Sequence, residues 1–317
     1  MPPASQELTV RPLTGPHELG LFLRLSYLLD HELAEDLESG RRRPEWMWVA
    51  LRGDRVVARI AWWSRDGDTP LLLDVFDLDD TLPGPEREEA GLRLLETATA
   101  AVVPAGAPRP EYGRYVPPDW REDPAARESV EARIRVMERS GARMLVERLR
   151  LEWRAGTPVP PDGGRLRFRP VEGREDLLAL MTPVMEGTLD AHGRADLASG
   201  LSAREAAEKH YDEELGGYTS PREWWRAAEL PGGEPVGFVI PARNAYNPII
   251  AYIGVLPARR GHGYVDDILA EGTRVLAAQG GVDRIRASTD LGNAPMAASF
   301  ARLGYVDFGR SFDMVWD

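Results

Sequence analysis

Apolar and polar positions alternate near the start of the chain, at residues 8–15, and the same alternation returns at residues 166–173. Alternation with a period of two predicts a strand in both places, and each strand runs into a loop before an apolar helix. Self-similarity with a period of about 160 residues predicts two copies of one domain. Three further pairs of segments correspond in the same order in both halves. Residues 46–50 correspond to 224–228, residues 55–60 to 235–240, and residues 139–153 to 302–316.

Within each copy the order is a strand, one or two helices, three strands, a helix, a strand, a helix and a final strand pair. This order is typical of an α/β (α+β) layout. Residues 155–164 are rich in proline and glycine, which predicts a linker between the copies. The predicted domains are therefore 1–154 and 165–317, joined by 155–164.

The most informative segment runs from a predicted strand at residues 249–255 into a glycine-containing helix start. A helix N-terminus offers unpaired backbone N–H groups and a partial positive charge, so anions bind there. Gly261 and Gly263 remove side chains that would hold a pyrophosphate away from these groups, and Arg259 and Arg260 add positive charge. The segment reads Gly254-Val255-Leu256-Pro257-Ala258-Arg259-Arg260-Gly261-His262-Gly263.

This run resembles the acetyl-CoA motif of the GNAT superfamily, in which a strand ending in Val-x-Pro leads to Arg-Gly-x-Gly and a helix. The resemblance continues through a strand at 285–290, then Asn293 at a helix start, Phe300, and Leu303-Gly304-Tyr305. It implies two tandem GNAT-like domains, each a mixed, mostly antiparallel twisted sheet flanked by helices. It also implies acetyl-CoA as co-substrate and no metal.

The resemblance implies a sheet that splays into a V beside Val255, with the pantetheine arm of the cofactor in the gap. Backbone N–H groups of Val255 and Leu256 are then expected to bind that arm, and the N–H of Val255 to stabilise the developing oxyanion. Asn293 is expected to cap its helix and touch the arm. The residues implied to hold the cofactor are Val255, Leu256, Arg260, Gly261, His262, Gly263, Tyr264, Val265, Asn293 and Phe300.

Three positions depart from the family pattern. Val265 stands where a small residue is expected, and Phe300 stands where many relatives place a tyrosine that returns a proton to the departing thiolate. Register counted back from Arg260 puts Asn247 where the histone-acetylating branch has a glutamate base. Proton transfer therefore requires another side chain, a water chain, or an acceptor that is already neutral.

Tyr252 and Asp290 are the candidate catalytic side chains beside Val255. Tyr252 has the alternative of strand core packing, and Asp290 that of a local helix cap. The helix around His210 is expected to cover the acceptor pocket, although an exposed acidic face is the commoner meaning of its sequence. The pair Trp224-Trp225 is expected to divide between core and pocket, because neighbours on a strand point opposite ways.

The corresponding loop of the N-terminal copy, residues 76–85, carries Asp77, Asp79 and Asp80, which would repel a pyrophosphate. Pro83 and Pro85 lack the N–H donors that a phosphate needs. The N-terminal copy is therefore predicted to be degenerate, retained for packing, pocket closure or specificity.

A formal net charge of -12 disfavours nucleic acid as a partner, and the absence of cysteine excludes disulfides, thiolate zinc sites and cysteine nucleophiles. No apolar run approaches the roughly 20 residues of a membrane span, and residues 1–7 lack the pattern of a signal peptide, so we expect a cytoplasmic monomer or homodimer. The favoured hypothesis is an N-acetyltransferase whose acceptor, a primary amine of a small molecule, attacks the thioester directly. Alternatives are a non-catalytic acetyl-CoA sensor or regulatory protein, a mycothiol synthase-like enzyme and an aminoglycoside acetyltransferase.

Overall fold

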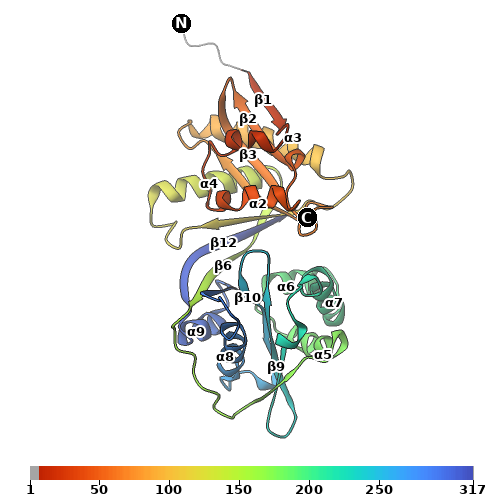
Figure 1. Cartoon of the computed structure of the whole chain (residues 1–317). Helices are drawn as coiled ribbons and strands as arrows, with labels where there is room; N and C mark the ends of the chain where they lie inside the picture. The colour runs from red at the N-terminus through yellow and green to blue at the C-terminus, as the bar shows by residue number, and fades with distance from the viewer. Residues whose placement is uncertain (1–6, 317) are drawn as a thin grey trace. The chain divides into compact units, whose positions relative to one another are not determined.

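The computed structural model describes residues 7–316 (Figure 1). Residues 1–6, which carry most of the segment on which the prediction of no signal peptide rests, lie outside the described residues, as does residue 317. Two compact units divide the chain: one extends to Glu147 and includes the residues from Ser311 onward, and the other is Arg148–Arg310. Within residues 7–316, no helix is long and apolar enough to cross a membrane.

The first unit is a mixed sheet with helices. Its neighbouring strands follow the order β1-β2-β3-β4-β5, and β4 and β5 are parallel while the other pairs are antiparallel. The apolar faces of α3 and α4 pack on this sheet. Its elements are β1 (Leu8–Pro12), α1 (Leu19–Phe22), α2 (Leu33–Glu38), β2 (Met47–Arg52), β3 (Arg55–Trp63), β4 (Leu72–Leu78), α3 (Gly84–Val102), β5 (Glu111–Val116), α4 (Pro124–Arg139) and the start of β6 (Ala142–Arg154).

The second unit repeats this plan with the strand order β6-β11-β10-β9-β8-β7; among these neighbours, β10 and β11 are parallel and the other pairs are antiparallel. Its α/β element order confirms the predicted duplication. The elements are β7 (Arg167–Pro170), α5 (Arg174–Val184), α6 (Ala191–Ala198), α7 (Ala203–Glu213), β8 (Arg226–Glu229), β9 (Pro235–Arg243), β10 (Pro248–Val255), α8 (Tyr264–Ala277), β11 (Arg284–Asp290), α9 (Ala294–Arg302) and the start of β12 (Val306–Trp316).

The unit boundaries differ from the predicted ones because two long strands each contribute to both units. From Arg148 to Arg154, β6 pairs with β11, so these residues belong to the second unit and not to a domain ending at 154. The end of β12, from Ser311 onward, belongs to the first unit, where Phe312 and Met314 are buried and the Phe312 ring lies 5.9 Å from that of Tyr112. The predicted linker, 155–164, contains no helix or strand.

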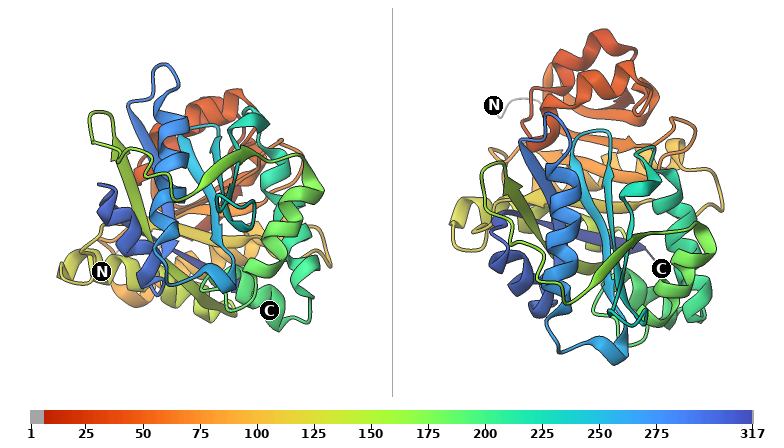
Figure 2. Two further views of the ribbon diagram at one scale, coloured as in Figure 1. Left: turned by 90° about the horizontal axis from the view of Figure 1, so that it is seen from below. Right: turned by 60° about the horizontal axis from the view of Figure 1, so that its bottom comes forward.

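The sheet of the second unit is covered on both faces (Figures 1 and 2). On one face, α8 and α9 pack through Ile268, Leu269 and Phe300 on a core cluster with β10 and β11. On the other face, α5 and α7 pack on β9 and β10 through a cluster that includes Leu177, Ala206 and Phe238. The site described next lies between these layers, where β10 and β11 separate.

Candidate active site

Strands β10 and β11 separate along their length. β10 pairs with β9 along its whole length, from Pro248 to Val255. With β11 it pairs only near its start, where Ile249 lies opposite Arg286. In an antiparallel pair, alternate residues direct their backbone groups to the partner strand. Leu256 donates its N–H to the carbonyl of Val236 at 2.9 Å, so the N–H of Val255 points to the β11 side. The predicted V therefore opens beside Val255.

The expectation that the N–H of Leu256 binds the cofactor is wrong, because the bond to Val236 uses that donor within the sheet. The side chain of Leu256 packs against the cluster formed by α5 and α7. Of the two residues, Val255 is the one whose main-chain donor lies on the side of this strand that faces away from β9.

Five consecutive backbone N–H groups, from Gly261 to Val265, have no hydrogen-bond acceptor among residues 7–316. Gly261 (φ 81°) and Gly263 (φ 73°) adopt the left-handed region that favours glycine, and Gly263 is the N-cap of α8. A Cβ placed at either glycine would meet no atom within 4 Å, so the space before these donors is open. This arrangement of donors at the start of a helix fits an anion such as a pyrophosphate.

The two arginines of this loop have different roles. Arg260 donates to the carbonyls of Val184 and Glu186, at 2.9 and 2.7 Å, and so caps the C-terminal end of α5; a further bond of 3.2 Å goes to the carbonyl of Val255. The guanidinium of Arg260 therefore binds carbonyl groups of the protein, and the loop receives only the backbone of this residue. No described residue hydrogen-bonds to or pairs with the side chain of Arg259.

Sequence reasoning missed a third arginine at this loop. Arg165, just after the predicted linker, donates to the carbonyl of His262 at 2.7 Å and lies over the ring of Tyr264 at 5.0 Å. Its side chain is half exposed and lies 3.4 Å from the carboxylate of Asp267. No local motif marks it, because it meets the loop 97 residues away along the chain.

The two predicted positions on α9 differ in their surroundings. Asn293 caps α9 as predicted, since its side chain accepts from the N–H of Met296 at 3.3 Å. Phe300 is 1% exposed and packs edge-on against Tyr305, with ring centroids 5.0 Å apart. Its position is therefore core packing beneath the gap, and contact with a cofactor arm remains a prediction.

Tyr252 faces the helices α5 and α7. Its ring stacks on that of His210, with centroids 4.5 Å apart, and lies 5.2 Å from that of Phe238. Burial, with the charges of Asp190 and Glu214, raises the pKa of the Tyr252 phenol well above its usual range, and Arg260 opposes this only in part. The phenol therefore stays protonated near neutral pH, where it can donate a hydrogen bond and cannot act as a base.

Asp290 does not present a free carboxylate. It is buried, with one oxygen 3.0 Å from Nε of Arg148 and the other accepting the N–H of Ala191 at 2.6 Å. Arg148 also contacts Asp190 at 3.1 Å and the ring Nδ1 of His192 at 2.9 Å. Asp290 therefore joins β6, β11 and the start of α6, and its catalytic role stays a prediction.

The expected strand position of Trp224 and Trp225 is wrong. Arg222–Trp224 form a 3-10 helix and β8 begins at Arg226, so the two indoles do not alternate across a sheet. Trp225 is buried at 3% exposure in the cluster of α5 and α7, and Trp224 is partly buried. Both belong to the core.

The corresponding gap of the first unit, between β4 and β5, contains arginine side chains. Their pairing consists of Leu72 and Leu73 opposite Glu111 and Tyr112, after which the strands separate. Arg114 donates to the carbonyl of Phe76 at 2.9 Å, and Arg133 to that of Leu78 at 3.0 Å. These carbonyls point away from β3, into the position where a working copy would admit a pantetheine arm. The gap is therefore filled by protein.

Carboxylates pair with both arginines: Arg133 lies 2.7 Å from Asp80, and Arg114 pairs with the buried Asp77. Asp77 accepts from Arg59 and Arg114, both at 2.9 Å. Burial alone would raise the pKa of Asp77, but the charges of Arg114 and Arg59 outweigh it and hold that pKa below its usual range. The aspartates predicted only to repel phosphate thus also fix the side chains that fill the gap.

We expect Asp77→Ala to lower the free energy of unfolding of the first unit by about 3–5 kcal/mol, because it removes the carboxylate that pairs with the buried Arg114 and leaves Arg59 with Asp30 alone. Urea denaturation measures this change. Asp54→Ala, at an exposed turn, is the control, with an expected change within about 0.5 kcal/mol. Equal midpoints for the two variants would contradict the structural role of Asp77.

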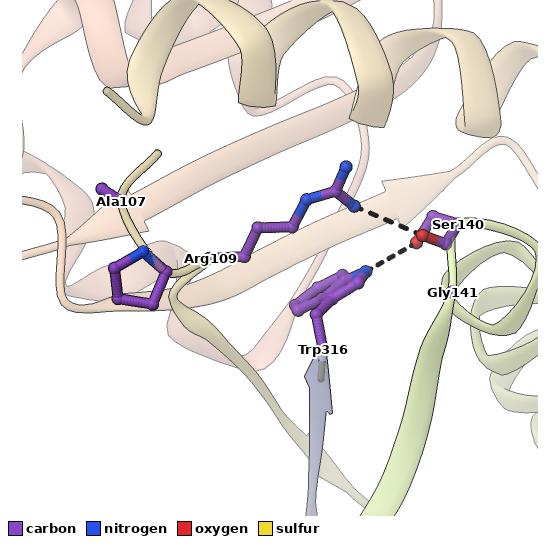
Figure 3. A pocket seen from close by; sticks show the side chains of 6 residues that line it. Ala107, Arg109, Ser140, Gly141 and Trp316 are labelled. Carbon is purple, nitrogen blue, oxygen red and sulfur yellow. Dashed lines mark hydrogen bonds between the residues drawn. The ribbon is translucent and has the colours of Figure 1, made fainter. Parts of the chain in front are cut away.

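A cavity of about 420 Å³ in the first unit does not belong to this gap (Figure 3). It is lined by residues between α3 and β5, at the end of α4 and at the end of β12. Arg109 and Trp316 both hydrogen-bond to Ser140 at its wall, at 3.3 and 3.1 Å. These contacts hold three chain segments together.

Residues 195–305 match the model of the acetyltransferase (GNAT) family. No curated protein matches the sequence. Among solved structures, a GCN5-related N-acetyltransferase from Sphaerobacter thermophilus matches with a TM-score of 0.58 and 18% identity, over 97% of this chain and 94% of that one.

Two other solved structures extend the likeness. A tandem GNAT protein from the clavulanic acid biosynthesis pathway matches with a TM-score of 0.50 and 18% identity, over 97% of this chain and 98% of that one. A glucosamine N-acetyltransferase region of a fungal multi-domain GH3 beta-N-acetylglucosaminidase matches with a TM-score of 0.57 and 14% identity, over 98% of this chain and 38% of that one. At these identities the likeness establishes the fold, which extends over nearly the whole chain.

Proposed function

We propose that this chain, whose C-terminal unit belongs to the GNAT acetyltransferases, transfers an acetyl group from acetyl-CoA to a primary amine of a small molecule. Acetyl-CoA is the donor used by the family. The single observation that carries the proposal is the run of five unpaired N–H groups from Gly261 to Val265, beside the open end of β10.

The residues of the second unit can perform the steps of such a transfer. The donors of the loop and the side chains of Arg259 and Arg165 bind the pyrophosphate and charged end of the donor. The N–H of Val255 lies where the thioester oxygen gains negative charge as the amine attacks, and it stabilises that charge. The acceptor approaches from the face covered by α5 and α7, where Tyr252 and His210 stack.

The test is acetyl-CoA turnover with the full chain over four amines: putrescine, glucosamine, glycine and benzylamine. Thiol release is followed, and N-acetylated product is identified by mass spectrometry. We expect at least one amine to be acetylated at a rate that saturates with both substrates. Acetyl-CoA binding without turnover of any of these amines would contradict the proposal and favour the sensor.

The second candidate, a non-catalytic acetyl-CoA sensor, has one specific observation in its favour. Two positions considered for proton transfer are poorly suited to it, since Phe300 lacks a hydroxyl and the carboxylate of Asp290 pairs with Arg148. Under this alternative, acetyl-CoA and desacetyl-CoA would bind with similar affinities and no amine would be consumed. Calorimetry with both ligands, together with the turnover assay, separates the two functions.

A further inference from the structure

A histidine on α7 lies against the strand that leads to the proposed reaction centre. His210 is one-quarter exposed, and its ring stacks on Tyr252 at an interplanar angle of 28°. Tyr252 precedes Val255 by three residues on β10, a distance of about 10 Å along a strand. The imidazole therefore borders the face from which an acceptor would approach the N–H of Val255.

The two ring nitrogens of His210 have different surroundings. Nε2 is buried, has no hydrogen-bond partner among the described residues, and lies 3.6 Å from Oε2 of Glu214, one turn along the chain. Glu214 is held in turn by the hydroxyl of Tyr218, which donates to its other oxygen at 2.8 Å. Nδ1 is not buried, and no described residue hydrogen-bonds to it. One nitrogen thus faces a carboxylate and the other is open.

The charged groups on the neighbouring elements mostly have partners of their own. Arg174 of α5 pairs with Asp212, Glu175 of α5 with Arg204, and Asp196 of α6 with Lys209. Asp190, at the start of α6, contacts Arg148, and Arg260 caps α5. Glu214 is the carboxylate that lies within 4 Å of a ring nitrogen of His210, at 3.6 Å from Nε2. A carboxylate facing one nitrogen fixes the tautomer that leaves the other nitrogen free to accept a proton.

We infer that His210, oriented by Glu214, is the general base of the acetyl transfer; this inference rests on the proposed function. The amine nitrogen attacks the thioester carbon, so that a C–N bond forms and the C–S bond breaks. Nδ1 of His210 takes the proton released by the amine nitrogen, directly or through one water, and coenzyme A leaves as thiolate. The imidazolium then returns the proton to the thiolate or to solvent, and Glu214 stabilises the positive ring in between.

The test measures kcat/KM against pH with the best acceptor among putrescine, glucosamine, glycine and benzylamine. We expect His210→Gln to lower kcat/KM about 10²-fold near neutral pH and to remove the ascending limb that a histidine produces. The loss should shrink at high pH, where the amine is already neutral. Added imidazole should restore part of the rate in His210→Ala, which a merely structural histidine would not allow.

Glu214→Gln and Glu213→Gln form a matched pair of controls. Glu213 is exposed on the same helix, and no described residue hydrogen-bonds to or pairs with its side chain, so its variant should retain the wild-type profile. Glu214→Gln should lower kcat/KM, because the carboxylate that fixes the tautomer of His210 is lost. If His210→Gln keeps the wild-type rate and the ascending limb of the pH profile, His210 is not the general base. The proposed function would still stand in that case, because the wild type turns over acetyl-CoA. Absence of turnover in the wild type would overturn both.

Discussion

Replacing Gly263 with aspartate should abolish most acetyl-CoA binding while leaving the fold intact. A Cβ at Gly263 meets no atom within 4 Å, and aspartate is among the residues that visit the left-handed region, so the substituted chain should fold. The new carboxylate lies at the N-cap of α8, against the position of the pyrophosphate. Two like charges at about 4 Å repel by about 4 kcal/mol at a protein surface, and a hundredfold loss of affinity requires about 3 kcal/mol.

The matched control for this variant is Gly281→Asp. Gly281 also has a positive φ, of 75°, and open space around a Cβ, so the same residue, strain and charge are introduced in the same unit away from the loop. Calorimetry should give one acetyl-CoA per chain for the wild type and for Gly281→Asp. A stoichiometry near two, or retained binding in Gly263→Asp, would show that the gap between β4 and β5 admits the cofactor despite Arg114 and Arg133.

The second large effect is expected from removal of one backbone donor. Val255→Pro should lower kcat about 10²–10³-fold, because it deletes the N–H proposed to stabilise the oxyanion. Proline is tolerated where a strand N–H has no partner, and the N–H of Val255 points away from β9. The measurement is kcat with saturating acetyl-CoA and the best amine of the panel.

Val255→Ala is the control for this variant, since it shortens the side chain and keeps the N–H. Its kcat should stay close to that of the wild type. If Val255→Pro folds with an unchanged thermal midpoint and turns over as fast as Val255→Ala, the oxyanion is stabilised by another donor. The comparison separates the backbone group from the packing of the side chain.

Local pattern was sufficient to locate the strands, the duplication and the phosphate loop. Segments 46–50 and 55–60 overlap β2 and β3, segments 224–228 and 235–240 overlap β8 and β9, and the helix start expected at Gly263 is that of α8. Each of these depends on residues that are close in the chain, such as the glycines that permit a positive φ at 261 and 263. The boundary at 154 was displaced because β6 continues into the second unit, where its partners on β11 lie between Arg284 and Asp290, far along the chain.

By itself, the sequence determined that one half carries a loop suited to a phosphate and that the other half carries aspartates and prolines there. Only the tertiary structure decided which side chains are available. Arg259 and Arg260 are adjacent and identical, yet Arg260 caps α5 while Arg259 has no partner among the described residues. Asp290 meets Arg148, 142 residues away. The physical reason is that the partners of a charged side chain are the groups that folding brings within hydrogen-bond distance. Many of those groups are far away in the sequence, so no local sequence pattern predicts them.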